Sequence, residues 1–345
     1  MGCPLYCGLL THEEEQCVAT QPLADQPDSF AELHRALASN LSRVIQGKPQ
    51  AIDLVLLGLI AEGHVLVEDV PGVGKTTLAK ALAVSIEGNF GRIQFTPDLL
   101  PSDVVGVNVW NRTTGSFEFR PGPVFANVVL ADEINRASPK TQAALLEAMA
   151  ERQVTIDGTT RHLPPPFLVI ATQNPIENEG TYPLPESQLD RFLLKVSMGY
   201  PARQAELEIL SSHGDRDLLA DLRPVVTAAQ VNGLAVAART VHVAPALQGY
   251  LVDLAEASRS HPHIDVGMSP RATLSLQRVA RARAATRNRT FVTPDDIKAL
   301  AVPTLAHRII LSPAARVAQV SAELVVADIV ASVAQPDPRP VQSTR

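Results

Sequence analysis

Cysteine is scarce in this sequence and is confined to one end of it. The 345 residues contain three cysteines, Cys3, Cys7 and Cys17, and none follows them. A fold held together by disulfides needs cysteine pairs along its length, so the sequence argues against that class and favours a reducing compartment, the cytoplasm. Because no further pair of ligands at zinc spacing completes Cys3 and Cys7, we expect no metal site there.

Long apolar runs are also missing. A membrane-spanning helix needs about 18 or more consecutive apolar residues, and the best candidate, residues 52–70, is interrupted by Glu62, Gly63 and His64. The first residues lack the basic stretch of a secretory signal and carry three glutamates at 13–15. We therefore expect no membrane span and no export signal.

A basic excess, which is the usual mark of a nucleic-acid binder, is absent as well. The formal net charge is −6 and the isoelectric point is about 5.9, which disfavours nucleic acid as a partner. Five arginines do crowd one expected helix: Arg278, Arg281, Arg283, Arg287 and Arg289. They could form a local nucleic-acid patch, but the acidic total favours a solvated or subunit-facing helix.

What the sequence does contain is a series of short apolar runs that alternate with helical stretches. The runs lie at 64–67, 93–95, 128–131, 167–171 and 192–196, and helical spacing covers 29–46, 51–61, 76–86 and 139–150. Such runs between helical stretches are typical of parallel strands that are buried on both faces. We therefore predict a three-layer α/β sandwich with a parallel sheet.

Composition divides the chain into four parts. They are an irregular N-terminal extension over 1–28, the α/β core over 29–200, an all-helical lid domain over 201–335 and a proline-rich flexible tail over 336–345. The strand signals stop after Pro201. Ser269-Pro270 and Thr293-Pro294 beyond that point are N-cap residues followed by proline, which is a helix-start signature.

A glycine-rich loop joins the first expected strand to the following helix. The strand HVLVED (64–69) leads into VPGVGKTT (70–77). Gly72 and Gly74 let backbone N–H groups converge on phosphate, Lys75 places a cation on the β- and γ-phosphates, and Thr76 offers a hydroxyl to Mg²⁺. The pattern G-x-x-x-x-G-K-[ST] is missed at its first position, which is Asp69. The alternative is a plain glycine-rich turn, but the order strand, loop, helix favours a P-loop.

Two further strand ends carry polar residues. The strand that begins near Asn127 ends in Asp132 and Glu133. We expect Asp132 to hold the Mg²⁺ shell and Glu133 to act as the general base that orients the attacking water. The strand at 167–171 leads to Asn174, which could bond the γ-phosphate or the water. The residues expected to bind ATP are Pro71, Gly72, Val73, Gly74, Lys75, Thr76, Thr77 and Asp132, with Thr76 and Asp132 as the metal ligands.

With these motifs located, the sequence resembles the MoxR family of AAA+ ATPases. The resemblance rests on GHVLVEDVPGVGKTTLAKALA (63–83), RIQFTPDLLPSDVVG (92–106), ADEINRASPKTQAALLEAMAERQVTIDG (131–158), ATQNPIENEGTYPLPESQLDRFLLKV (171–196) and GMSPRATLSLQR (267–278). It covers roughly residues 35–312. Five separate blocks agree in order, so the resemblance is specific.

The resemblance implies roles for three further residues and a set of partners. Asn174 matches the first sensor, Arg191 the arginine that is supplied to a neighbouring subunit's ATP, and Arg271 the second sensor in the lid. It also implies that ATP lies between core and lid, and that the chain forms a ring, expected to be a hexamer. Such ATPases remodel or mature a client protein, sometimes with metal or cofactor insertion, and often work with a protein that has a von Willebrand factor A domain.

Two predicted hairpins and two rival functions stay open. Residues 153–162 and 107–122 are expected to turn at Asp157-Gly158 and Thr114-Gly115, and either hairpin could contact a client or simply decorate the surface. The rival functions are a nucleic-acid motor, which the acidic charge disfavours, and a regulator that uses ATP as a switch without hydrolysing it. The presence of Lys75, Asp132, Glu133 and Asn174 disfavours the second rival.

Overall fold

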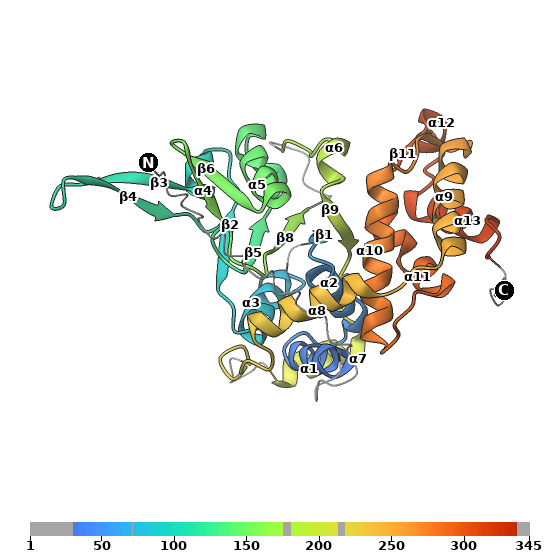
Figure 1. Ribbon diagram of the computed structural model, residues 1–345, viewed down its shortest axis with the longest axis horizontal. Coiled ribbons are helices and arrows are strands. Elements are labelled where there is room, and N and C mark those ends of the chain that lie inside the picture. Colours follow the sequence, from blue (N-terminus) through green and yellow to red (C-terminus); the bar gives the residue numbers. More distant parts are fainter. Residues whose placement is uncertain (1–29, 71, 175–180, 213–217, 337–345) are drawn as a thin grey trace, which may run out of the picture.

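A five-stranded parallel sheet forms the centre of the computed structural model, which describes residues 30–70, 72–174, 181–212 and 218–336. Its strand order is β2-β5-β8-β1-β9 (Figure 1). The strands are β1 (His64–Glu68), β2 (Phe90–Gln94), β5 (Val128–Asp132), β8 (Leu168–Gln173) and β9 (Phe192–Val196). All five predicted strands are present, although β2 begins three residues before the apolar run that predicted it.

Alternate residues of the strands enter two different apolar cores, because successive strand side chains point to opposite faces. Val65 and Val67 join the cluster that includes α1, α2 and α3, whereas Leu66 joins the one that includes α4 and α5. These helices are α1 (Phe30–Ser42), α2 (Pro49–Ile60), α3 (Lys75–Ser85), α4 (Pro101–Val105) and α5 (Pro139–Glu151). The three-layer α/β sandwich is therefore confirmed.

Two antiparallel hairpins leave the body of the core. The first pairs β3 (Gly106–Asn111) with β4 (Ser116–Pro121) and projects as an arm (Figure 1), and the second pairs β6 (Gln153–Ile156) with β7 (Thr159–His162). Both turns fall where the sequence predicted them. Gly115 and Gly158 have φ of 65° and 77°, which glycine adopts without strain.

The chain after Pro201 is helical, as predicted, with one addition. Its helices are α7 (Arg203–Ser212), α8 (Ala228–Thr240), α9 (Pro245–Ser260), α10 (Pro270–Thr286), α11 (Pro294–Leu305), α12 (Pro313–Val317) and α13 (Ala322–Ser332). The addition is a small sheet of β10 (Ile264–Val266) and β11 (Ile310–Leu311), so the prediction of a wholly helical unit was wrong in this detail. Strands of three and two residues are too short to show a periodic pattern.

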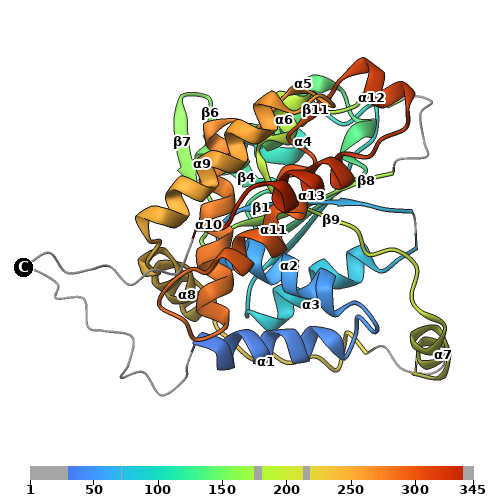
Figure 2. The same ribbon diagram turned by 90° about the vertical axis from the view of Figure 1, so that its right-hand side faces the viewer.

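The lid packs against the core through α2, α8 and α10. Figure 2, in which the lid faces the viewer, shows α10 and α11 in front of the sheet. Buried side chains of α8 and α10, such as Leu234 and Leu276, belong to the same apolar cluster as those of α2. Among the described residues, no helix is both long enough and apolar enough to cross a membrane.

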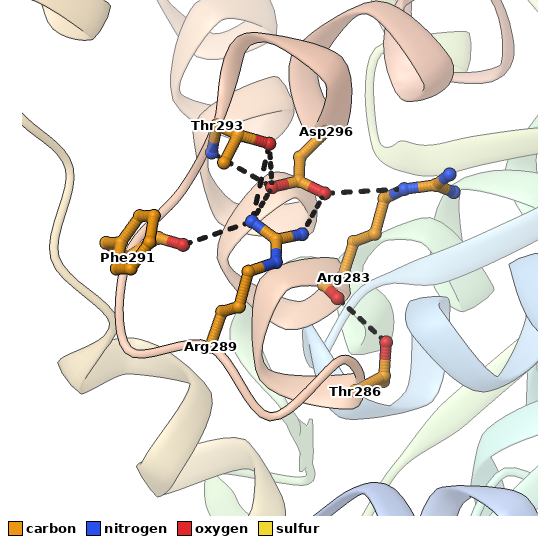
Figure 3. A network of polar contacts seen from close by, with 6 residues as sticks. All are labelled: Arg283, Thr286, Arg289, Phe291, Thr293 and Asp296. Atoms are coloured by element: carbon orange, nitrogen blue, oxygen red, sulfur yellow. Dashed lines mark hydrogen bonds and ion pairs between the residues drawn. The ribbon is translucent and has the colours of Figure 1, made fainter. Parts of the chain in front are cut away.

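Part of the arginine-rich segment serves the interior of the lid (Figure 3). Asp296 is fully buried and accepts two bonds of 2.7 Å from Arg289, while Arg283 approaches it to 3.6 Å. Burial raises the pKa of the Asp296 carboxyl, but the bonds from Arg289 and Thr293 outweigh this and leave that pKa below its usual range. Two of the five arginines are therefore structural, which weakens the case for a nucleic-acid patch.

Candidate functional site

The three polar strand ends meet at one edge of the sheet. In a parallel sheet the last residues of all strands lie at the same edge, which we call the carboxyl edge. β8 lies between β1 and β5, with Val67 opposite Thr172 and Ala131 opposite Ala171. Thus the loop after β1, the acids at the end of β5 and Asn174 after β8 are neighbours, as the sequence predicted.

The glycine-rich loop has the backbone that its sequence requires. Gly72 and Gly74 have φ of 84° and 90°, a region that other residues rarely adopt. α3 begins at Lys75, so the unpaired N–H groups of its first turn, which includes Thr76 and Thr77, face the loop. These N–H groups and the helix dipole suit a phosphate. Pro71 lies outside the described residues.

Lys75 folds back into the loop. Its Nζ donates to the Asp69 carbonyl at 2.9 Å and to the Val70 carbonyl at 3.3 Å. The Lys75 ammonium is therefore held inside the loop by two neutral backbone carbonyls, whose place phosphate oxygens could take.

A cleft of about 230 Å³ opens beside this loop. It is lined by Val44, Ile45, Gln46, Lys48, Gly72, Val73, Gly74, Thr77 and Pro201. Its lining is mostly apolar side chains and loop backbone, which suits a base and ribose next to a phosphate site.

Asp132 and Glu133 are held by a network that reaches β8. Thr172 donates its hydroxyl to Asp132 Oδ1 at 2.8 Å and accepts the Glu133 N–H at 2.9 Å. Arg92, on β2, pairs with Asp132 Oδ2 at 2.8 Å. With both oxygens already bonded, Asp132 fits a cation through a water molecule, and carboxylate and hydroxyl oxygens are the donors that Mg²⁺ prefers.

Glu133 occupies an unusual backbone position for a glutamate. Its φ is 57°, in the left-handed region that non-glycine residues rarely adopt and that clusters at functional sites. Gln94 and Arg136 both bond its Oε2, at 3.0 and 2.9 Å. The surrounding groups thus hold the carboxylate in place, next to the strand end where a water could be activated.

Asp69 is a residue whose role the sequence did not reveal. Its Oδ2 accepts the backbone N–H of Met198, the N–H of Gly199 at 2.9 Å and the Ser197 hydroxyl at 3.3 Å. The residue as a whole is 7% exposed. It ties the start of the phosphate loop to the segment that follows β9 and leads to Pro201, a wall of the cleft. Thr172 and Arg92 were missed in the same way, because their partners lie about 40 residues away.

Arg191 lies at the other edge of the sheet, formed by the first residues of the strands, which we call the amino edge. Phe192 is opposite His64, the first residue of β1, and five residues of strand separate His64 from Asp69, about 16 Å. Arg191 Nη1 donates to the Leu146 carbonyl of α5 at 2.7 Å. In this structure Arg191 is therefore remote from the phosphate loop of its own chain.

Arg271 also lies at the amino edge. It is the second residue of α10 and approaches Asp190 to 3.8 Å, and Arg308 approaches the same carboxylate to 3.5 Å. The place of ATP relative to the lid stays a prediction, but Arg271 lies beside the start of β9 and not beside the phosphate loop of its own chain. The physical reason is that Asp190 and the Phe192 carbonyl, which accepts from Arg308 at 2.6 Å, anchor the lid to the start of β9.

Asn174 is buried at the end of β8, with 8% of its surface exposed. It directly follows β8, the strand between the loop and the acids, so its position suits a sensor of the bound phosphate. Its role stays a prediction.

Comparisons with known proteins agree with this geometry. Residues 64–194 match the model of the ATPase family associated with various cellular activities (AAA), and 256–329 match the AAA lid domain. The crystal structure of a protein from Cytophaga hutchinsonii superposes with a TM-score of 0.84 at 39% identity, covering 89% of this chain and 96% of that one.

Curated relatives extend the match over most of the chain. The uncharacterized protein YeaC of Bacillus subtilis is 49% identical, over 91% of this chain and 98% of its own length. The chaperone MoxR1 of Mycobacterium tuberculosis is 41% identical, over 88% and 82%. The protein MoxR of Paracoccus denitrificans is 35% identical, over 79% and 87%. The chain belongs to the MoxR family of AAA+ ATPases.

Proposed function

We propose that this protein hydrolyses Mg²⁺-bound ATP within a hexameric ring of identical subunits and uses the energy to remodel or mature a client protein. Lys75 and the N–H groups around Gly72 and Gly74 bind the phosphates. Glu133 accepts a proton from the attacking water, and Asn174 positions that water or the γ-phosphate. Thr76 and, through water, Asp132 would hold Mg²⁺, which neutralises charge on the phosphate oxygens.

The observation that supports a ring is the distance between the carboxyl edge and the amino edge of the central sheet. The loop, Asp132 and Glu133 lie at the carboxyl edge, while Arg191 and Arg271 lie at the amino edge. Phosphoryl transfer needs added positive charge in its transition state. If identical subunits stack head to tail, the amino edge of one meets the carboxyl edge of the next. Arg191 and Arg271 then serve the neighbour's ATP.

The proposed chaperone role rests on the relatives and on the β3–β4 arm. Trp110 and Phe117 lie opposite each other on the arm and are 52% and 69% exposed. Their rings make an edge-to-face contact at 5.1 Å. An exposed aromatic pair on a projecting hairpin suits contact with an apolar client segment. A partner with a von Willebrand factor A domain remains an expectation from the family resemblance.

Mixed rings test the arrangement. Arg191→Ala and Lys75→Ala proteins should each be nearly inactive, with turnover reduced about 10³-fold or more for Arg191→Ala. Mixed together, they should recover activity, because an intact Lys75 on one subunit can meet an intact Arg191 on its neighbour. Turnover should be maximal near equal proportions.

The control is Arg112→Ala, which removes an exposed arginine at the turn of the β3–β4 arm and should leave turnover unchanged. Subunit exchange is confirmed by co-purification of two differently tagged variants. A flat, inactive profile from proven mixed assemblies would remove Arg191 as a residue that acts on the neighbouring subunit. Arg271→Ala should complement Lys75→Ala in the same way.

A further inference from the structure

A second cleft, of about 250 Å³, lies between the core and the lid on the side of the amino edge. It is lined by the end of α2 with Glu62, by Arg239 and its neighbours on α8, and by Leu274, Gln277, Arg278 and Arg281 of α10. Three arginines and one glutamate are its charged lining residues. The ATP site at the carboxyl edge does not use any of them.

Glu62, the one carboxylate among these lining residues, already pairs with two arginines. Glu62 accepts a bond from Arg152 at 2.8 Å through Oε1 and a bond from Arg239 through Oε2. Its backbone carbonyl accepts the second Arg152 nitrogen at 3.0 Å. Glu62 is therefore shared by Arg152 and Arg239, and no bond joins it to Arg278 or Arg281 in the described part of the chain.

Arg278 and Arg281 have no carboxylate partner in the described part of the chain. Neither forms a hydrogen bond or an ion pair with any residue in the described part of the chain, and Arg281 Nε is buried without a partner. Arg278 keeps an exposed surface at the cleft, and partial desolvation, together with the charges of Arg152, Arg239 and Arg271, lowers the pKa of its guanidinium to about 10. Guanidinium groups that lie side by side repel one another, and an anion bound between them would offset that repulsion.

From the two unpaired arginines, the committed glutamate and the cleft between them, we infer that this is a binding site for a multivalent oxyanion of the phosphate class. Arg278 and Arg281 are three residues apart on α10, so their side chains share one face of the helix. Planar guanidinium forks match phosphate oxygens two at a time. The surplus of positive charge favours a di- or trianion over a single carboxylate.

The phosphate has two conceivable sources, and both provide the same chemistry. Arg271 and Arg278 are seven residues apart on α10, about 10 Å along the helix, so the cleft continues the surface that we propose faces the neighbouring subunit's nucleotide. Alternatively, a free polyphosphate or nucleotide enters from solution. The oxyanion site itself requires neither ATP hydrolysis nor ring formation.

Tripolyphosphate is a suitable probe, with Lys75→Ala as the parent protein so that binding at the P-loop is weakened. Titration calorimetry should show one site per chain. Arg278→Gln and Arg281→Gln, each made in this parent, should weaken binding about ten-fold or more, the loss of charge-assisted bonds. Arg287→Gln is the matched control, because Arg287 is exposed at the end of α10 and does not line the cleft.

Without the anion, Arg278→Gln should melt at an equal or higher temperature than its parent, because it relieves repulsion and breaks no bond. This readout separates a ligand site from a structural role. Absence of saturable binding to the Lys75→Ala protein would overturn the inference. So would equal affinities for Arg278→Gln, Arg281→Gln and Arg287→Gln.

To identify the source of the phosphate, tripolyphosphate binding is measured with wild-type protein that is saturated with a non-hydrolysable ATP analogue. If the cleft receives the neighbour's nucleotide, the analogue should block tripolyphosphate, and Arg278→Gln should weaken the analogue's binding only when subunits assemble. If the phosphate comes from solution, one tripolyphosphate per chain should still bind. Each result supports the site and assigns its source.

Discussion

The two edges of the central sheet differ in how their charges are matched. At the carboxyl edge each acid has partners within the chain: Asp132 pairs with Arg92, Glu133 with Arg136, and Asp69 with backbone N–H groups. At the amino edge, arginines outnumber the acids. Arg191 donates to a backbone carbonyl, and Arg271 and Arg308 share Asp190.

This difference explains why one subunit alone does not bring the phosphate loop and the unmatched arginines together. The loop that we propose binds phosphate lies at one edge, and surplus guanidinium groups lie at the other, about 16 Å of strand away. Arg92 and Arg136 at the carboxyl edge already pair with Asp132 and Glu133, so in the proposed ring the added transition-state charge comes from the amino edge of a neighbour. Two such edges on identical copies are complementary, which is what a head-to-tail interface in a closed ring requires.

The largest effect is expected from removing the cation of the carboxyl edge. Lys75→Ala should abolish ATP binding or weaken it by about 100-fold or more, because no other side chain in the described loop can place a positive charge on the phosphates. Binding of a fluorescent nucleotide measures this. Lys80→Ala is the control: it lies on the same helix but stacks over Phe90. Unchanged affinity for Lys75→Ala would mean that the loop is not the phosphate site.

The next effect concerns the chemical step at the same edge. Glu133→Gln should still bind ATP but should hydrolyse it about 100-fold more slowly or worse, because the amide cannot accept the proton of the attacking water. Single-turnover hydrolysis measures the step. Glu147→Gln, on the exposed face of α5, is the control. Turnover at the normal rate would exclude Glu133 as the base.

Local patterns explain why the carboxyl edge could be predicted. The strands are short apolar runs, and the loop, Asp132 and Glu133 directly follow strands, so their positions depend on neighbours in sequence. The bond from Thr172 to Asp132 and the three contacts of Asp69 join segments 40 and about 130 residues apart. Nothing in the local sequence encodes such partners.

The amino edge shows the limit of prediction most clearly. Arg271 was recognised from the motif SPRA, but its position depends on how the whole lid packs against β9. That packing depends on buried groups such as His307, which contacts the Phe192 carbonyl at 3.0 Å. The roles of Asn174, Arg191 and Arg271 stay predictions until the variants are measured.

A smaller effect is expected at Asp69, which supports the loop without contacting phosphate. Asp69→Ala leaves the buried N–H group of Met198 and the partly buried N–H group of Gly199 without an acceptor, at a cost of about 1–3 kcal/mol. The free energy of unfolding should fall by that amount, and the KM for ATP should rise more than kcat falls, because the wall of the cleft loosens. Asp69→Asn keeps one acceptor and should lose less. If both variants match the wild type, Asp69 does not position the loop.

The smallest effect concerns how the free energy of unfolding changes at acidic pH, and it tests a neutral residue at the arginine-rich amino edge. His64, at the start of β1, contacts the Met149 carbonyl at 3.0 Å through Nε2 and accepts the Val169 N–H at 3.0 Å through Nδ1. The ring is therefore neutral, which keeps it from adding to the arginine charge. Burial lowers the pKa of His64 to about 4, with a partial offset from the Met149 carbonyl.

The direction in which stability changes with pH follows from proton uptake by the unfolded chain. Between pH 6.5 and about 4 the unfolded chain protonates His64 and the folded chain does not, so the free energy of unfolding falls as the pH decreases through that window. One such histidine contributes at most about 1.4 kcal/mol per pH unit, and His307, whose pKa burial lowers to about 3, acts in the same direction.

Urea unfolding from pH 7 to 5 should therefore show a shallower pH dependence for His64→Gln, whose amide can both donate and accept. His162→Gln, on the exposed β6–β7 hairpin, should keep the wild-type slope. Equal slopes for all three proteins would show that His64 is not held neutral by the fold.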